Sequence, residues 1–284
     1  MNGPVRARFA DGRWHFQHGP IDLVIGAEGR AAAVEAAIED CWAAFGDVLP
    51  TLVAELRTLR APCTAHTRAA GPVASRMVGA CRPYARDLGL FLTPMAAVAG
   101  AVADHLIRCF HRPGVARAYV NDGGDIALHL TEGQSFDIGV VADIDAPRLD
   151  GALRIEAGDP VRGVATSGWR GRSFSFGIAD AVTVLAADAA AADAAATLIA
   201  NHVNVEAPGI ERAPADSLRD DTDLGARLVT VRVPPLAPAL VHEALRRGEA
   251  FARSCLERGW IHAALLTLQG RSRMLDSTTM AALA

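Results

Sequence analysis

The sequence has no excess of positive charge and no long apolar run, and each absence excludes a class of protein. Its 28 Lys and Arg residues are outnumbered by 32 Asp and Glu residues, which gives a net charge of -4. Such a chain has no field that attracts a polyanion, so we expect no nucleic-acid partner. No run approaches the roughly 18 apolar residues of a membrane span, and the first residues lack the apolar centre of a signal peptide. We therefore expect a cytoplasmic protein with no membrane partner.

The chain also lacks the spacings that mark zinc sites, disulfide frameworks and common nucleotide loops. Its five cysteines lie far apart and none belongs to a CxxC pair, which favours reduced thiols. There is no GxGxxG, no P-loop and no HExxH, so a dinucleotide fold, a phosphate-binding P-loop and a zinc protease are not indicated. At 284 residues the chain is long enough to bury a sizeable core.

The apolar periodicity predicts an α+β fold with an antiparallel sheet and long helices packed on it. A run of short strands joined by turns, typical of antiparallel pairing, is expected in the middle of the chain. These strands are expected over 118–121, 126–130, 136–141 and 153–156, and further strands over 14–16, 21–25, 174–186, 228–233 and 261–268. Helices are expected over 30–59, 73–81 (ended by Pro83), 93–111 and 235–256, with a loop over 208–225. We expect one domain over 1–270 and a C-terminal tail over 271–284.

The segment 163–204 contains most of the candidate functional side chains. Ala165-Thr166-Ser167-Gly168 supplies small residues and two hydroxyls, and Trp169-Arg170-Gly171-Arg172 then presents two guanidinium groups around a glycine. This pattern suits an anion-binding loop. A valine-rich strand follows, and Asp188 is placed to cap the alanine-rich helix after it.

Asp193, Thr197 and Asn201 recur at every fourth position of that helix, so their side chains share one stripe. A carboxylate and a hydroxyl one turn apart are the hard oxygen ligands that Mg²⁺ or Ca²⁺ takes. The alternative is that Asp193 is a solvated helix residue and Thr197 bonds back to a carbonyl, and spacing alone favours this alternative.

Asn121-Asp122-Gly123-Gly124-Asp125 lies between two predicted strands and also has two interpretations. Asp-Gly and Gly-Gly are what a tight hairpin turn requires. Glycines also let backbone N–H groups approach a nucleotide. Considered alone, the segment favours the turn.

Four of these segments, in this order, resemble the signatures of the ApbE-like FAD:protein FMN transferase superfamily. The segment 96–104 (AAVAGAVAD) resembles its AIAKGYAVD helix, Gly123-Gly124-Asp125 its nucleotide loop, 165–168 its ATSG loop and 192–197 (ADAAAT) its ADAxAT helix. The sequence as a whole is more similar to an uncharacterised ApbE-related branch described as thiamine-biosynthesis-like. The resemblance covers roughly residues 19–269.

The resemblance implies a T-fold-related architecture in which a flavin nucleotide, FAD or FMN, lies between sheet and helices and Mg²⁺ bridges its pyrophosphate. It implies metal ligation by Asp193, Thr197 and the carbonyl of Ala96. The implied cofactor contacts are Asn121, Gly123, Gly124, Asp125, Thr166, Ser167, Gly168, Gly100 and Asp104. Arg170 and Arg172 are the candidate catalytic or anion-binding residues. A protein acceptor and assembly into a homo-oligomer are further expectations.

Two departures from the family pattern leave the function open. Ala99 stands where the family has a lysine, and 172–180 is shorter than the family's HxxDPxTG segment and has no histidine. Three hypotheses follow: a metal-dependent enzyme acting on a flavin, nucleotide or pterin-like ring, by FMN transfer or FAD hydrolysis; a flavin- or nucleotide-binding module without turnover; and a structural partner protein that keeps only the fold.

Overall fold

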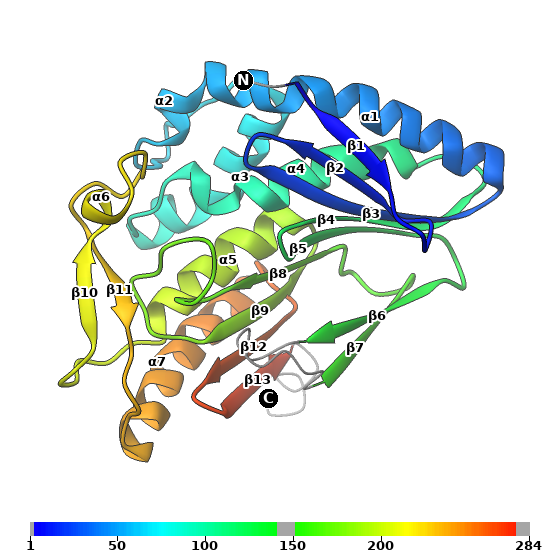
Figure 1. Cartoon of the computed structure of the whole chain (residues 1–284). Coiled ribbons are helices and arrows are strands. Elements are labelled where there is room, and N and C mark those ends of the chain that lie inside the picture. Colours follow the sequence, from blue (N-terminus) through cyan, green and yellow to red (C-terminus); the bar gives the residue numbers. More distant parts are fainter. Residues whose placement is uncertain (1–2, 141–150, 277–284) are drawn as a thin grey trace.

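The structure, a computed structural model, describes residues 3–140 and 151–276 of the chain. Its main feature is an antiparallel sheet of nine strands in the order β1-β2-β3-β4-β5-β8-β9-β12-β13 (Figure 1). The strands are β1 (Val5–Arg8), β2 (Trp14–His18), β3 (Ile21–Gly29), β4 (Val115–Asp122), β5 (Asp125–Leu130), β8 (Gly163–Ser167), β9 (Ala181–Ala186), β12 (Ala263–Leu268) and β13 (Arg271–Asp276).

The long helices pack on one face of this sheet, as the apolar pattern predicts (Figure 1). They are α1 (Ala31–Ala54), α3 (Pro72–Leu88), α4 (Val98–Ile107), α5 (Ala189–His202) and α7 (Pro238–Glu257), with short turns α2 (Leu56–Leu59), η1 (Pro94–Ala97), η2 (Arg108–Phe110) and α6 (Ala215–Leu218). Helix α5 is central, and its alanines are buried between α4, α7 and the strands β8 and β9. The predicted fold class is confirmed. Within the described residues, no helix has the length and apolar character needed to cross a membrane.

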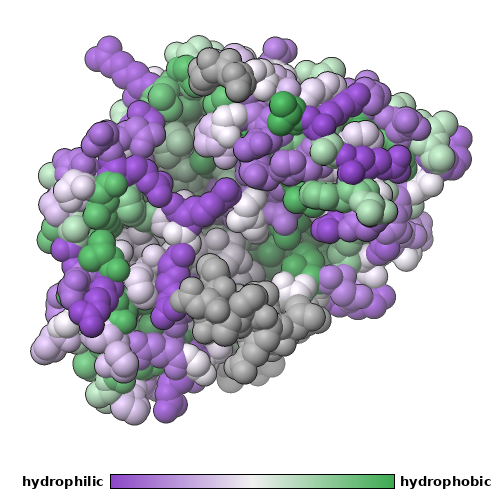
Figure 2. Space-filling model, in the orientation of Figure 1, coloured by the Kyte–Doolittle hydropathy of each residue, from purple (hydrophilic) through white to green (hydrophobic). Residues whose placement is uncertain are grey.

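The opposite face of the sheet is covered in part by a separate hairpin of β6 (Ser135–Val140) and β7 (Gly151–Glu156). Ile155 is buried there against Leu128, Leu130 and Val164 of the large sheet. The prediction that these strands continue one meander was therefore wrong in pairing, because β8 takes the place beside β5. A third pair, β10 (Glu211–Pro214) with β11 (Leu228–Arg232), forms a small hairpin. Figure 2 shows hydrophobic surface over this hairpin, where Leu228 is exposed.

Several predicted boundaries need correction. Helix α3 continues through Pro83, because burial of Met77, Cys81 and Tyr84 outweighs the proline's cost of about 3 kcal/mol. The expected tail begins as a strand, since Arg271–Asp276 pairs with β12, while 277–284 lies outside the described residues.

Irregular segments account for the other corrections. The expected strand over 174–186 is regular only from Ala181, and the expected loop over 208–225 contains β10 and α6. In each case the tertiary partner, not the local pattern, decides where the regular structure starts.

Two halves of the sheet meet at β5 and β8, which share only two register pairs, Ile126 with Val164 and Ala127 with Gly163. The tight turn before β5 and the loop after β8 flank this junction. Because so few backbone pairs join β5 to β8, side chains and loops make the other contacts between the two halves of the sheet. Most of the residues that the sequence singles out lie here.

Candidate functional site

The Asn121–Asp125 segment is the hairpin turn between β4 and β5. Gly123 and Gly124 have φ of 65° and 113°, which side-chain-bearing residues rarely adopt. The side-chain oxygen of Asn121 accepts a hydrogen bond from the Gly124 amide at 2.8 Å. The turn interpretation is therefore confirmed, and nucleotide binding by the same loop stays a prediction.

The turn is in direct contact with the loop that follows β8. The Thr166 amide donates to Oδ1 of Asp125 at 3.3 Å, which joins the ends of β5 and β8. A Cβ placed on Gly123 would lie 1.8 Å from a guanidinium nitrogen of Arg172, so that side chain covers the turn. The structure thus brings together two segments whose bonded residues are 41 positions apart in the sequence.

The small residues of the 165–168 loop are needed for its path. A Cβ on Gly168 would lie 2.3 Å from the carbonyl oxygen of Asp180. The Thr166 hydroxyl is hydrogen-bonded to that of Thr183 at 2.9 Å, whereas Ser167 is half-buried. Packing therefore explains Gly168, and the bond to Thr183 explains the Thr166 hydroxyl. Thr166 itself is exposed and lies at the junction of β5 and β8.

The two candidate arginines differ in availability. Arg170 lies 3.4 Å from Asp180 and stacks on Trp169, with its guanidinium 5.1 Å from the ring centroid. Arg172 is exposed and lies beside the acidic turn, where burial raises the pKa of Asp122 and Asp125 and the Arg172 charge offsets part of that rise. Arg172 is therefore the better placed of the two to bind an anionic group at the turn.

Helices α4 and α5 cap each other's first turn. On α5, Asp193 accepts a hydrogen bond from the Gly100 amide of α4 at 3.1 Å. On α4, Asp104 accepts from the Ala189 and Ala190 amides of α5 at 3.0 and 2.9 Å. These carboxylates satisfy amides that have no partner within their own helix. Gly100 itself is required by packing, because a Cβ there would lie 2.2 Å from the Ala189 carbonyl oxygen.

Three carboxylates accumulate beside the turn: Asp122, Asp125 and Asp193. Burial raises the pKa of Asp122 to about 7, and burial together with the neighbouring Asp122 raises that of Asp125 to about 7. Burial, followed by the charges of Asp125 and Asp122, raises the pKa of Asp193 well above its usual range. Burial, which the charge of Arg172 offsets only in part at Asp122 and Asp125, therefore raises the pKa of all three carboxylates.

Sequence reasoning missed Asp122 as a site residue. It is the last residue of β4 and only 5% exposed. The one available signal was its position inside the Asn-Asp-Gly-Gly-Asp segment, and a buried carboxylate at a strand end cannot be told from a turn residue by sequence pattern alone.

The predicted metal ligands lie close to this cluster. Asp193 contacts the start of α4 through Gly100, four residues after Ala96, and the half-buried Thr197 lies one turn further along α5. Among the described residues, no three His, Cys, Asp or Glu side chains are arranged to hold a metal ion. The predicted set contains a single carboxylate, with a hydroxyl and a carbonyl, and such oxygen donors fit Mg²⁺ with water and phosphate completing its shell. The assignment stays a prediction.

The third member of the polar stripe has a structural role. The side-chain oxygen of Asn201 accepts hydrogen bonds from the Ser175 hydroxyl at 3.1 Å and the Phe176 amide at 2.8 Å. These bonds fix the segment 172–180 against α5. The segment that lacks the family's histidine is therefore packed in place and joins the Arg172 loop to the helix carrying Asp193.

An antiparallel sheet with helices on one face, and a glycine turn and a hydroxyl loop meeting at its centre, defines the class of fold. The same fold occurs in the apo form of the flavinyl transferase ApbE of Pseudomonas stutzeri, with a TM-score of 0.50, 14% identity and coverage of 99% of this chain and 96% of that one. The family model described as AbpE bacteria matches residues 6–274, and the chain belongs to that family. The resemblance seen in the sequence is confirmed.

Three curated relatives of this chain are each named UPF0280 protein. That of Methanosphaerula palustris is 38% identical over 184 residues, which cover 62% of this chain and 73% of the relative. That of Methanoculleus marisnigri is 40% identical over 162 residues, which cover 54% of this chain and 63% of the relative. The match to the Methanosarcina acetivorans protein spans 47% of that relative's length. These names assign no activity.

Proposed function

We propose that this protein binds a flavin nucleotide together with a divalent cation at the junction of β5 and β8. The observation that carries the proposal is the meeting of three segments distant in sequence: the glycine turn, the Arg172 loop and the part of α5 that carries Asp193. Asp125 links them, since it is bonded to Thr166 and its charge adds to the burial that raises the pKa of Asp193. The kinship with a flavinyl transferase supports a flavin over other nucleotides.

Each of the three segments has side chains or backbone groups that suit one role in binding the ligand. The Gly123-Gly124 turn offers backbone close to a ligand, and the exposed Arg172 beside it offers a cation for a phosphate. Asp193, Thr197 and the Ala96 carbonyl would hold the cation. When bound, the cation would neutralise charge on the pyrophosphate as its anhydride bond breaks. Ala99 in place of lysine makes Arg172 the basic side chain of choice for the pyrophosphate.

The reaction that fits such a site is cleavage of the FAD pyrophosphate. In transfer, a hydroxyl oxygen of an acceptor protein bonds to the phosphorus of the FMN half, the anhydride bond breaks, AMP leaves and the hydroxyl proton is released. In hydrolysis, water replaces the acceptor. The absence of a histidine from 172–180 favours a second candidate, flavin or pterin binding without turnover.

The test uses thermal shift and calorimetry with FAD, FMN, ADP and a pterin, each with and without Mg²⁺. We expect Mg²⁺-dependent FAD binding that Asp193→Asn weakens about tenfold or more, because the substitution removes a charged ligand. The amide oxygen of Asn can still accept from the Gly100 amide, so the fold should persist. Asp47→Asn, at an exposed position on α1, is the control.

Binding of FAD with release of AMP identifies turnover, and binding without AMP release identifies the binding module. Equal Mg²⁺-dependent affinity in wild type and Asp193→Asn would remove the metal assignment. No response to any of the four ligands would remove the flavin site itself.

A further inference from the structure

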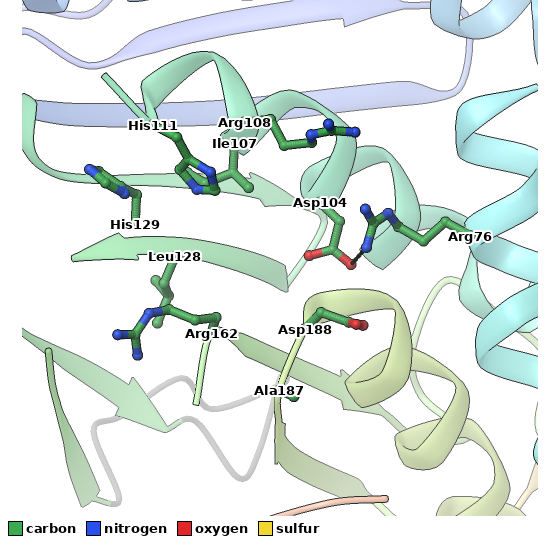
Figure 3. Close-up of a pocket in the computed structure, with 10 residues that line it drawn as sticks. All are labelled: Arg76, Asp104, Ile107, Arg108, His111, Leu128, His129, Arg162, Ala187 and Asp188. Atoms are coloured by element: carbon green, nitrogen blue, oxygen red, sulfur yellow. Dashed lines mark ion pairs between the residues drawn. The ribbon is translucent and has the colours of Figure 1, made fainter. Parts of the chain in front are cut away.

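A cavity of about 550 Å³ lies where β5 and β8 meet the N-terminal end of α5, and it is strongly basic (Figure 3). Its basic lining comprises Arg76, Arg108, Arg162, His111 and His129, and Asp104 and Asp188 are its two carboxylates. The basic side chains come from α3, η2, the residues just before β8 and after η2, and β5. Apart from Asp104, none of the residues assigned to the flavin site lines this cavity.

The field inside the cavity is positive at its histidines. Burial lowers the pKa of His111, and the charge of Arg108 lowers it further. Burial also lowers the pKa of His129, with His111 and Arg162 acting in the same direction. The two imidazole rings lie close, with centroids 4.9 Å apart. Burial is the largest cause for both rings, and the neighbouring basic side chains add to it.

The three arginines are committed to different degrees. Arg162 is fixed, since it donates to the carbonyls of Ala157, Asp159 and Val161. Arg76 lies 3.7 Å from Asp104. No hydrogen bond or ion pair joins the exposed Arg108 guanidinium to another described residue. A fixed arginine beside one that has no bonded partner in the described part of the chain is an arrangement suited to an exchangeable anion.

The other polar groups of the cavity are a buried imidazole nitrogen and two carboxylates. Nε2 of His129 is buried and has no hydrogen-bond partner among the described residues. Asp104 and Asp188 lie at the opposite side of the cavity (Figure 3) and accept the first amides of α5. The end of α5 is therefore already capped, and the anion-binding capacity of the cavity rests on its arginines and histidines.

We propose that this cavity binds a small phosphate monoester. The phosphate would lie between Arg108, Arg162 and the histidines, and hydroxyl groups of the ester would face Asp104 and Asp188 across an apolar floor of Ile107 and Leu128. The volume accommodates a ligand of the size of a phosphorylated polyol. The cavity lies beside the far end of α4 from Ala96 and shares only Asp104 with the residues assigned to the flavin junction.

The binding should strengthen as the pH falls from about 8 to about 6, within the range where imidazoles protonate. The phosphate faces cationic Arg76 on α3, Arg108 on η2 and Arg162 before β8. It also faces His111 and His129. A bound dianion would offset the charges of Arg108 and Arg162, and the two imidazoles would then protonate more readily. Burial raises the pKa of Asp104 on α4 to about 7, so this carboxylate opposes binding once it ionises, which acts in the same direction with pH; the carboxylate of Asp188 before α5 also faces the cavity.

Calorimetry with inorganic phosphate and with glycerol 3-phosphate, in the absence of Mg²⁺, tests the proposal. We expect both to bind, the ester more tightly, and Arg108→Gln to weaken both about tenfold. Arg271→Gln, an exposed arginine on β13, is the matched control and should bind as wild type does. His129→Gln should reduce the pH dependence.

Absence of binding by both probes, or equal binding by wild type and Arg108→Gln, would overturn the proposal. Asp193→Asn separates it from the flavin proposal, since that substitution should leave phosphate-ester binding unchanged. Failure at one site therefore leaves the other site testable.

Discussion

At the scale of single residues, glycines mark the places where two backbones touch. Gly100 of α4 lies against the Ala189 carbonyl, and neither backbone can move away because each helix is capped by the other. Gly79, by contrast, is an exposed residue inside α3 with open space around the position of a Cβ. The two glycines look alike in the sequence and have opposite consequences.

Gly100→Ala should lower the free energy of unfolding by about 2–3 kcal/mol, because its Cβ would overlap a backbone carbonyl that has no room to shift. Gly79→Ala should raise it by about 0.5–1 kcal/mol, since alanine has the higher helix propensity. Urea denaturation of both variants measures the difference. A Gly100→Ala variant as stable as wild type would contradict the tight α4–α5 contact.

At the scale of elements, the mutual capping of α4 and α5 connects the two halves of the molecule. Asp104 and Asp193 each reach from one helix to the first turn of the other, while Asp188 caps its own helix by accepting from the Ala191 amide at 2.8 Å. The helix that carries the predicted metal ligands is thus held by a residue of the phosphate-ester cavity. This arrangement places both proposed sites on one rigid pair of helices.

Asp188→Ala should cost about 1 kcal/mol of stability, the usual effect of losing one capping bond. Asp104→Ala should cost more, about 2–3 kcal/mol, because it leaves two buried amides of α5 without an acceptor. Amide hydrogen exchange at Ala189, Ala190 and Ala191 should accelerate in Asp104→Ala. If Asp104→Ala and Asp188→Ala lower the free energy of unfolding equally, the cap that Asp104 provides from α4 is no stronger than the cap that Asp188 provides within α5.

At the scale of the whole molecule, buried carboxylates should give the stability an unusual pH dependence. Asp104, Asp122 and Asp125 each have a pKa raised to about 7, chiefly by burial. The unfolded chain releases these protons near pH 4, so their contribution to stability is present below about pH 4 and is lost as the pH rises to about 7. Buried histidines with lowered pKa, such as His111 and His202, act in the opposite direction near their ordinary pKa.

A difference measurement isolates the carboxylates. The double variant Asp122→Asn, Asp125→Asn should be less sensitive to a change from pH 5 to pH 8 than the wild type, whose free energy of unfolding should fall more over this range. The side-chain amide oxygen that Asp125→Asn introduces can still accept from the Thr166 amide, which preserves the sheet junction. Denaturation curves at the two pH values provide the comparison. An equal fall in both proteins would show that the cluster is ionised in the folded state.

Local patterns were sufficient for most elements and for the candidate loops. Alternation and turn residues predicted the central strands, the N-cap at Asp188 was predicted from its place before an alanine-rich run, and the four ordered segments predicted the family. Pro83 misled the prediction of α3, because a local breaker was outweighed by burial that no local pattern reports. The strand pairing of β5 with β8 was equally out of reach, since the whole β6–β7 hairpin lies between them in the chain.

The sequence by itself determined the α+β class, the family and which residue types could bind a nucleotide, because periodicity, turn chemistry and ordered motifs are properties of short segments. Tertiary structure alone decided that Arg172 covers the glycine turn, that Asp104 and Asp193 cap each other's helices, and that three arginines and two histidines share one cavity. Those facts depend on burial and on contacts between distant segments. The charge state of a carboxylate follows from them, since desolvation and neighbouring charges exist only once the chain has folded.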